Sequence, residues 1–382
     1  MSPIRVGLIG LSSVDDKSAS VPGGWAATAH LPYFLKSPHY EITALCNSSV
    51  ESAEAAIKRH SLPLSTKAYA SAEDLAKDPN VDLVVCCVCV GKHHDVIMPA
   101  LQAGKAAFVE WPLASNLEQA EELLVAAKKS GSKTLVGLQS RASPVVQKVK
   151  DLVSKKAIGE LISSNFTFAV GMPGDTNTVA AEYIAYKKIG AGLLSILGAH
   201  SIDAVQYALG GLDEVSAHLS TRWSDVNLTK VDGSVERTIK RETPDHVLLH
   251  AIISGSNAPL SLSIRHGQTS PNAPNLIWSI MGTKGEIRVT SASALNLGLP
   301  TEKIEVLDFE KNAVETVEAS YAEEVKDFMM FANNVGTMYE LHANGGCAEQ
   351  GLVDFEQAVA VHKIIDAIER SSEGKKWEKV VL

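Results

Sequence analysis

The chain has 382 residues, of which 45% are hydrophobic and 21% are charged, so it is long enough to bury a large core and to form two domains. Its formal net charge of -9 argues against direct binding of nucleic acid, because such binding needs clustered cations that displace counterions from phosphates. The 5 cysteines show no disulfide framework and no zinc spacing, and no apolar run approaches the roughly 18 residues that span a membrane. We therefore expect a cytoplasmic protein, with a nuclear location also open, that binds neither a metal nor a membrane.

The first third of the chain alternates short apolar runs with helical patterns. Strands are predicted at residues 4–10, 40–46, 81–90, 106–109 and 134–138. Helices are predicted at residues 50–60, 71–76, 94–103 and 117–130, with Ser115 as the N-cap of the last helix and Glu118 three positions further on. This alternation is typical of a doubly wound parallel sheet, so it predicts a nucleotide-binding Rossmann domain over residues 1–139.

The pattern changes after residue 139. Helices are predicted at residues 144–154, 192–209, 321–335 and 355–372. Strands are predicted at residues 162–170, 214–221, 246–254, 260–266, 276–281 and 286–290. Residues 224–242 are polar and are predicted as a loop. These segments indicate a C-terminal α/β domain over residues 140–382, with an open and mostly antiparallel sheet.

The turn after the first strand lacks the tight glycine-rich motif of most dinucleotide sites. Gly10 ends the strand, and the next glycines arrive only at 23 and 24. A glycine is needed where the backbone approaches a pyrophosphate, and a helix N-terminus must face that group. We expect these contacts to come from Gly10, Ser12, Gly24 and Trp25. Asp15 and Asp16 would repel a pyrophosphate unless they point to solvent, so a Rossmann domain with a weak or empty site is the alternative.

The end of the second strand bears on the choice of cofactor. Asn47 stands where an acidic residue would bind the adenosine ribose of NAD. Without that carboxylate a 2′-phosphate is not repelled, and Ser48 and Ser49 can donate hydrogen bonds to it. NADP or NAD is therefore the expected cofactor. Alternatively, these are only turn-forming residues.

Six motifs stand in the order in which they occur in the glucose-fructose oxidoreductase/inositol dehydrogenase (Gfo/Idh/MocA) family. They lie at residues 6–10, 91–94, 103–105, 109–114, 198–203 and 282–285. The resemblance covers nearly the whole chain. Residues 23–26, 109–111 and 243–246 are most similar to the branch that contains the fungal galactose/lactose metabolism regulatory protein. The resemblance implies a Rossmann domain, a C-terminal sheet that mediates homodimers, and NAD(P)-dependent oxidation or reduction of sugars, cyclitols or related alcohols.

The same resemblance assigns cofactor-site residues. Glu110 matches the glutamate of the motif Glu-Lys-Pro, but Trp111 replaces the lysine that hydrogen-bonds the reacting hydroxyl in active members. An indole can stack on a ring, but it has no basic nitrogen and cannot relay a proton. His93 lies in a loop that lines the nicotinamide pocket in family members. Gln139 and Arg141 are further candidates at the domain junction.

A helix motif of the family supplies the acid/base candidates. His200 and Asp203 are retained, but the first carboxylate of the motif is missing. His200 can exchange a proton with a substrate alcohol or carbonyl, because imidazole titrates near neutral pH. Asp203, at i+3, is expected to orient it. A hydroxyl from Tyr186 or Tyr183 is expected to replace the missing acid.

Two main classes of function remain open. The first is an NAD(P)-dependent oxidoreductase that acts on a sugar-like or specialised cyclic alcohol or carbonyl. The second is a catalytically silent regulator, in which the dinucleotide site acts as a sensor and a protein partner binds. Non-redox acid/base chemistry in the same pocket is a third reading. We favour the oxidoreductase, with a small-molecule substrate and a homodimer formed through the C-terminal sheet.

Overall fold

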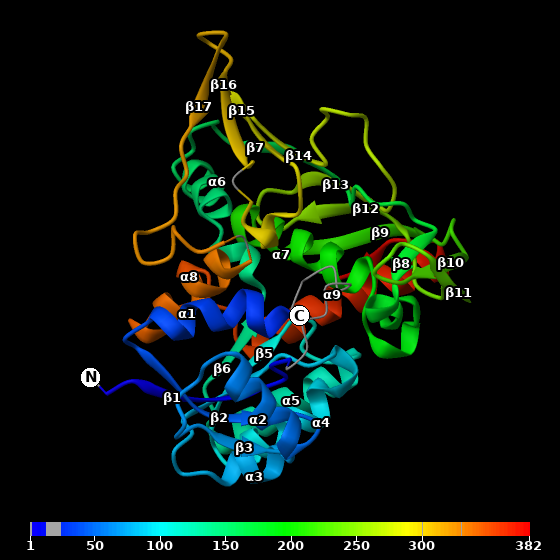
Figure 1. The fold of residues 1–382 in the computed structure, drawn as a ribbon. Coiled ribbons are helices and arrows are strands. Elements are labelled where there is room, and N and C mark those ends of the chain that lie inside the picture. Colours follow the sequence, from blue (N-terminus) through cyan, green and yellow to red (C-terminus); the bar gives the residue numbers. More distant parts are fainter. Residues whose placement is uncertain (1, 13–23, 300, 330) are drawn as a thin grey trace.

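The computed structural model describes residues 2–12, 24–299, 301–329 and 331–382 (Figure 1). Its N-terminal part contains a six-stranded parallel sheet with the strand order β3-β2-β1-β4-β5-β6. The strands are β1 (Ile4–Ile9), β2 (Tyr40–Cys46), β3 (Lys67–Tyr69), β4 (Leu83–Cys86), β5 (Ala106–Glu110) and β6 (Thr134–Gly137). This order confirms the predicted Rossmann fold.

Helices cover both faces of this sheet. They are η1 (Ala26–His30), which continues into α1 (Leu31–Lys36), and α2 (Val50–Arg59), α3 (Ala72–Lys77), α4 (His93–Gln102) and α5 (Leu117–Ser130). Successive residues of a strand point to opposite faces, so Leu8 and Ile9 of β1 belong to two different hydrophobic cores. The N-cap of α5 is Asn116 and not Ser115 as predicted. The Asn116 side chain accepts a hydrogen bond from the amide of Gln119 at 2.9 Å.

The described C-terminal part contains a nine-stranded sheet with the order β17-β16-β15-β14-β7-β13-β12-β9-β18. Only the β7/β13 pairing is parallel among these strands, which confirms the mostly antiparallel sheet. The strands are β7 (Leu161–Ala169), β9 (Leu212–Ser220), β12 (His246–Ile253), β13 (Ala258–Arg265), β14 (Leu276–Gly282), β15 (Gly285–Ser291), β16 (Lys303–Asp308), β17 (Ala313–Val317) and β18 (Glu378–Lys379).

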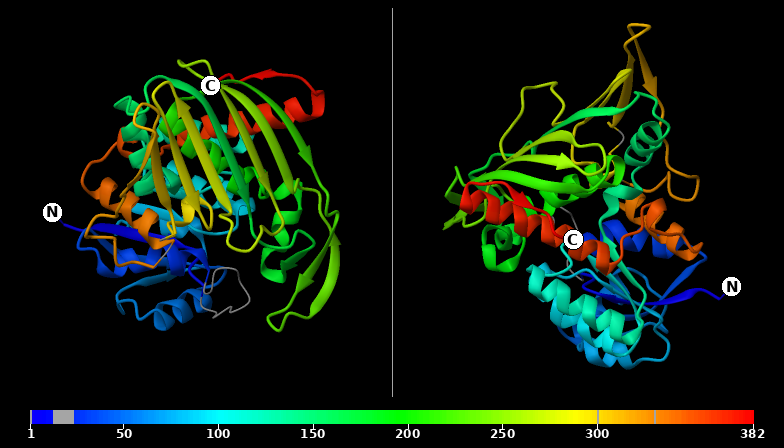
Figure 2. Two further views of the ribbon diagram at one scale, coloured as in Figure 1. Left: turned by 90° about the horizontal axis from the view of Figure 1, so that it is seen from above. Right: turned by 180° about the vertical axis from the view of Figure 1, so that it is seen from behind.

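Helices lie on one face of this large sheet, and its other face is open (Figure 2). The helices are α6 (Pro144–Ser154), η6 (Leu194–Gly198) with α7 (Ala199–Leu209), and α9 (Phe355–Gly374). Strand β12 alternates buried and more exposed residues, as expected of a sheet that is covered on one face only. None of the helices in the described ranges has both the length and the apolar character needed to cross a membrane.

Two predicted segments were wrong. Residues 224–242 form the hairpin β10 (Asp225–Thr229) and β11 (Val235–Lys240), which pairs with β8 (Thr176–Thr178). The hairpin escaped prediction because β11 is almost fully exposed, so it shows no apolar alternation. The helix predicted at 321–335 is instead α8 (Ala332–Ala343). The chain before α8 folds back on it, and Asn333 donates to the carbonyl of Val325 at 2.9 Å.

Helix α8 returns from the end of the chain to the Rossmann sheet. Its fully buried Tyr339 packs against Phe34 and Phe108, with ring centroids 4.6 and 5.1 Å away. The Tyr339 hydroxyl lies 2.7 Å from Nδ1 of His30, and Nε2 of His30 lies 2.8 Å from Oε1 of Glu110. With Glu110 as a carboxylate, which only accepts, Nε2 of His30 donates and Nδ1 accepts from the tyrosine. A hydrogen-bonded chain thus joins α8 to the end of β5.

Replacing this tyrosine hydroxyl tests the chain. Tyr339→Phe keeps the ring but leaves Nδ1 of buried His30 without its donor, so we expect the free energy of unfolding to fall by about 1–3 kcal/mol. Urea unfolding followed by circular dichroism measures the change. Tyr186→Phe removes a half-buried hydroxyl bonded to Glu182 and should cost less than about 0.5 kcal/mol. Equal effects of the two variants would contradict a special role of the chain.

Candidate functional site

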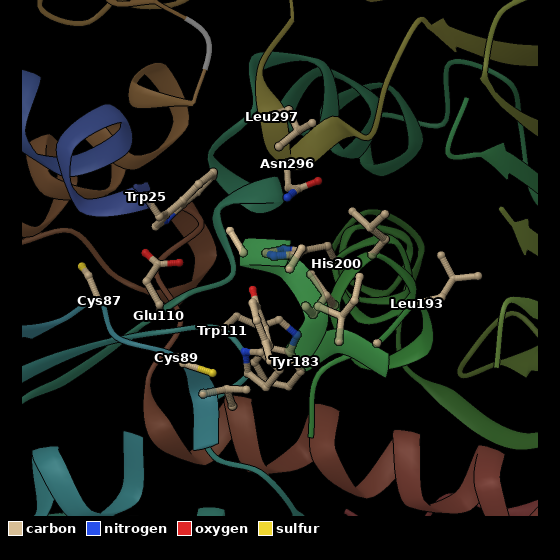
Figure 3. A pocket seen from close by; sticks show the side chains of 18 of the residues that line it. Trp25, Cys87, Cys89, Glu110, Trp111, Tyr183, Leu193, His200, Asn296 and Leu297 are labelled. Atoms are coloured by element: carbon tan, nitrogen blue, oxygen red, sulfur yellow. The ribbon is translucent and has the colours of Figure 1, made fainter. Parts of the chain in front are cut away.

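A cavity of about 450 Å³ lies between the carboxyl ends of the Rossmann strands and the helices under the second sheet (Figure 3). Ligand sites of open α/β sheets lie at this edge, and the volume is in the range of small-molecule pockets. Residues from both parts of the chain line it. The described lining residues are Gly24, Trp25, Cys87, Val88, Cys89, Val90, His93, Glu110, Trp111, Pro112, Gln139, Val170, Met172, Thr178, Ala180, Ala181, Tyr183, Ile184, Gly192, Leu193, Ile196, Leu197, His200, His266, Asn296 and Leu297.

The described residues at the two ends of the expected phosphate turn lie close together. Gly10 has φ +99°, and a Cβ there would lie 2.9 Å from the carbonyl oxygen of Cys87, so only glycine fits. Gly24 has φ +82°, and a Cβ built on it lies 3.9 Å from Cβ of Ser12. The chain therefore returns beside Ser12 before Trp25 begins the helix. Asp15 and Asp16 lie outside the described residues.

Two of the three polar side chains at the end of β2, those of Asn47 and Ser49, form hydrogen bonds within the protein. The Asn47 amide donates to the carbonyls of Leu11 at 2.8 Å and Ser52 at 3.2 Å. Ser49 is the N-cap of α2 and accepts from the amide of Ser52. Ser48 is exposed. Asn47 therefore braces the phosphate turn, and Ser48 is the residue here that faces solvent.

Glu110 and Trp111 are both held in place by hydrogen bonds. Besides its bond to His30, the Glu110 carboxylate leaves no room for a side chain at Gly137, where a Cβ would lie 2.8 Å from both carboxylate oxygens. The indole of Trp111 donates to the carbonyl of Ser195 at 2.7 Å, and its ring centroid lies 4.7 Å from that of His362. Trp111 therefore links the end of β5 to η6 and uses its only donor to do so.

His200 lies on the cavity wall with an unused ring nitrogen. It is 4% exposed, and its Nδ1 has no hydrogen-bond partner among the described residues. Burial lowers the pKa of His200 to about 3, so the imidazole is neutral at physiological pH.

Asp203 does not orient His200 as expected. Its carboxylate binds Arg141 in a bidentate manner, with Nη2 to Oδ1 at 2.6 Å and Nε to Oδ2 at 2.9 Å. Asp203 is fully buried and Arg141 nearly so, and neither is among the described lining residues. The guanidinium satisfies the carboxylate because an unpaired buried charge is costly. Asp203 and Arg141 thus form an internal ion pair behind the cavity.

The two candidate tyrosines lie in different places. Tyr183 lines the cavity (Figure 3), whereas the hydroxyl of Tyr186 donates to Glu182 at 2.8 Å and Tyr186 is not among the lining residues. Tyr186, which was expected to supply an acid, therefore lies outside the described cavity wall, and Tyr183 is the tyrosine that lines it. His93 is buried, with Nδ1 2.8 Å from the Pro112 carbonyl and Nε2 2.9 Å from the Val88 carbonyl. It fixes two loops of the wall.

Unpartnered polar atoms gather at this cavity. Among the described residues, nine buried side-chain nitrogen or oxygen atoms lack both a hydrogen-bond and an ion-pair partner, and six of them belong to lining residues. The six are Trp25 Nε1, Gln139 Oε1, Thr178 Oγ1, His200 Nδ1, His266 Nδ1 and Asn296 Oδ1. Sequence analysis missed Thr178, His266 and Asn296, because none of them lies in a recognisable motif. Buried polar atoms are normally paired, so pairing among the described residues is least complete in the side chains that line this cavity.

The residues fit a nicotinamide dinucleotide. Gly24 lies beside Ser12 and directly precedes a helix start, the kind of place where a pyrophosphate binds. Trp25 Nε1 and Gln139 Oε1 are an unpartnered donor and an unpartnered acceptor, which suits the oxygen and the amide of a carboxamide. Within the described part of the chain, no group of three or more His, Cys, Asp or Glu side chains is placed to hold a metal ion.

Comparisons with known proteins agree with this geometry. The family model "Oxidoreductase family, NAD-binding Rossmann fold" matches residues 18–138, and the model "Gal80p, C-terminal domain" matches residues 144–291. The dehydrogenase aclE of Aspergillus oryzae is 32% identical over 380 residues, which is 97% of this chain and 96% of that protein. The galactose/lactose metabolism regulatory protein GAL80 of Saccharomyces cerevisiae is 31% identical over 75% of this chain and 67% of its own length. The crystal structure of a super-repressor mutant of Gal80p from that yeast matches with a TM-score of 0.88 at 25% identity, over 99% of this chain and 98% of that one.

The buried histidines predict an acid-sensitive fold. Burial lowers the pKa of His362 to about 3, as it does for His200, whereas a histidine in the unfolded chain titrates near about 6.5. The folded-state pKa is depressed, so the unfolded state binds more protons below that pH. Stability that is present above about pH 6.5 is therefore lost as the pH falls toward the folded-state value. Each such histidine adds up to about 1.4 kcal/mol per pH unit to this loss.

Urea unfolding between about pH 7 and about pH 4.5 measures the slope. His362→Leu should make the loss of stability less steep by about one proton, whatever its effect at neutral pH. The same substitution at the exposed His250 controls for loss of a histidine. An unchanged slope in His362→Leu would show that this residue does not contribute.

Proposed function

This chain belongs to the Gfo/Idh/MocA oxidoreductase family, with an NAD-binding Rossmann fold, and we propose that it is an NAD(P)-dependent oxidoreductase of a cyclic alcohol or carbonyl. The observation that carries this proposal is the imidazole of His200, which lines the cavity and makes no hydrogen bond to a described residue. In this proposal His200 alone handles the substrate proton. Trp111 occupies the position of the usual lysine, and its role is structural because its indole N–H binds the carbonyl of Ser195.

The chemistry follows from a neutral imidazole. A bound nicotinamide dinucleotide supplies the hydride acceptor or donor. In the oxidation direction the substrate hydroxyl loses its proton to the imidazole of His200 as the carbonyl forms, and in the reduction direction the proton returns. Burial lowers the pKa of His200 to about 3, which keeps the imidazole unprotonated but also makes it a weak base. Trp111 cannot share the task because its single N–H is bound to Ser195.

Cofactor choice follows from the end of β2. We propose that both NAD and NADP are accepted, because the Asn47 side chain presents no charge to a 2′-phosphate. The Asn47 amide already donates to the carbonyls of Leu11 and Ser52, so it has no free donor for that phosphate. The exposed Ser48 is the position from which selectivity can be changed.

A regulator without catalysis is the second candidate. It is favoured by the Trp111–Ser195 bond, which removes a proton relay and ties the two parts of the chain together. The similarity to GAL80 supports the same reading. In this case the dinucleotide site acts as a sensor, and a protein partner binds. An isomerisation or elimination at His200 without hydride transfer is a third and weaker candidate.

The assembly and location are also proposals. We propose a division into a dinucleotide domain of residues 1–139 and a substrate domain of residues 140–382. The open face of the nine-stranded sheet is the proposed homodimer contact. We propose a cytoplasmic location for the oxidoreductase, and a nuclear one as well if the regulator reading holds.

Replacement of His200 tests the oxidoreductase. His200→Ala should lower kcat at least about 100-fold, because general acid/base groups contribute about 10²–10⁴-fold. The Kd of NADH, measured by calorimetry, should stay within about 3-fold. Ser201→Ala is the matched control, because this neighbouring hydroxyl bonds back to the Leu197 carbonyl and does not line the cavity. Full activity of His200→Ala would remove His200 from the mechanism.

A change at Ser48 tests the cofactor proposal. Ser48→Arg places a guanidinium where a 2′-phosphate is expected, so it should tighten NADP binding by at least about 10-fold, since one charge-assisted pair is worth about 1.5–3 kcal/mol. NAD affinity should change little. Ser48→Ala is the control and should alter neither Kd by more than about 2-fold. Equal strengthening of NAD and NADP would show that residue 48 does not face the ribose.

A further inference from the structure

We propose that the cavity selects a neutral, ring-shaped substrate that has one polar group at each end and an apolar middle, and that His266 recognises the end remote from His200. This inference rests on the proposed oxidoreductase function and gives its substrate class. It excludes sugars and other polyols, and it excludes acids and phosphates.

The absence of available charge is the first argument. Among the described lining residues, Glu110 is the only acidic one, and lysine and arginine do not occur. Glu110 is already bonded to His30. The two histidines with free nitrogens are neutral, because burial lowers the pKa of His200 to about 3 and of His266 to about 4. A charged substrate would thus be buried without a counter-charge, which is strongly unfavourable.

The apolar wall is the second argument. The second part of the chain covers most of the cavity with aliphatic and thioether side chains. These are Val170, Met172, Ile184, Leu193, Ile196, Leu197 and Leu297. A polyol carries hydroxyls around its ring, and each one needs a partner when it leaves water. These seven side chains offer none. The polar groups on this side of the cavity, on Thr178, Tyr183, His200, His266 and Asn296, are fewer than the six hydroxyls of myo-inositol, so the wall favours a ring whose middle is hydrocarbon.

Two polar side chains of the C-terminal part, His200 and Asn296, lie near each other on the cavity wall. His200 lies on α7 and Asn296 on η7 (Leu295–Leu297), and these elements are in contact. Figure 3 shows both side chains on the cavity, with Trp25 and Glu110 of the Rossmann part across from them. This end is next to the expected nicotinamide, so it holds the reacting group.

His266 belongs to a different region of the wall. It directly follows β13, where the backbone of Gly267 pairs with Met172 and that of Val170 with Arg265. Its imidazole lines the cavity and makes no hydrogen bond to a described residue. A neutral imidazole can donate or accept, so it suits a hydroxyl or a carbonyl. The aliphatic residues Val170 and Met172 accompany it, which places an apolar surface next to this second polar contact.

A four-compound panel tests the substrate class. Binding to the full chain with NADH present is measured by calorimetry for trans-cyclohexane-1,4-diol, cyclohexanol, myo-inositol and trans-4-hydroxycyclohexanecarboxylate. The diol has two polar ends, cyclohexanol has one, and the others add hydroxyls or a charge. The diol should bind at least about 10-fold more tightly than each of the other three, since one buried hydrogen bond is worth about a tenfold change.

Variants at His266 assign the remote contact. His266→Leu should abolish the preference for the diol over cyclohexanol while leaving the affinity for cyclohexanol within about 3-fold. His266→Asn keeps a polar group and should retain part of the preference. Val125→Ala, at an exposed position on α5, is the control and should behave as the parent protein. Thermal unfolding of each variant verifies that it is folded.

The outcomes separate this inference from the proposed function. Tightest binding of myo-inositol or of the carboxylate, or a preference for the diol that survives His266→Leu, would overturn the inference. Failure of all four compounds to bind while NADH binds would overturn it as well. Oxidation of each compound is recorded in parallel samples that contain NAD or NADP in place of NADH, because an alcohol can give its hydride only to the oxidised nicotinamide. The expected selectivity without turnover supports the substrate class and contradicts the oxidoreductase, whereas rapid turnover of myo-inositol does the reverse.

Discussion

The hydrogen bond from the indole of Trp111 to the carbonyl of Ser195 determines how the cavity is built. It joins the end of β5 to η6, a π-helical turn directly before the helix that carries His200. Turns of this kind are rare and are often found at functional sites. Trp111 belongs to the Rossmann part of the chain and η6 to the C-terminal part. The position of His200, which follows η6, therefore depends on a contact between these two parts. In the family motif a lysine at this position hydrogen-bonds the reacting hydroxyl, whereas Trp111 binds the carbonyl of Ser195 and holds the cavity wall in place.

Neighbouring polar groups are bound to the protein in the same way. Glu110 is held by His30, which is held by Tyr339, and Asp203 is held by Arg141. These side chains satisfy one another, so they stabilise the walls and are not free for proton transfer. His200 keeps a free nitrogen at the cavity, and it has no neighbouring carboxylate to raise its basicity. The site therefore relies on a neutral imidazole and an apolar surround, which differs from a polar sugar site.

Sequence patterns predicted the parts of the fold whose apolar residues recur at a regular spacing. The parallel sheet followed from apolar runs alternating with helical segments, and the second sheet from period-two alternation in strands such as β12. The β10/β11 hairpin and α8 were missed because their positions depend on distant partners, β8 and the Rossmann core. Motifs pointed to His200 and Trp111, but no motif could show that Asp203 binds Arg141, 62 positions away in sequence. His266 and Asn296 come from separate loops, so only the folded chain brings them to one cavity.

The unpartnered atoms bear on both classes of function. Leaving one buried polar group without a partner costs about 1–3 kcal/mol, and six such atoms belong to residues of this one cavity. A protein whose cavity had lost all ligand binding would gain stability by exchanging these residues for apolar ones, which fit among Leu193, Ile196 and Leu297 without cost. Their presence therefore favours a cavity that still binds a ligand, whether the chain is an enzyme or a sensor. Proton transfer distinguishes the two classes. In a sensor His200 only has to form a hydrogen bond with the ligand, whereas in an enzyme it also has to accept a proton from the substrate.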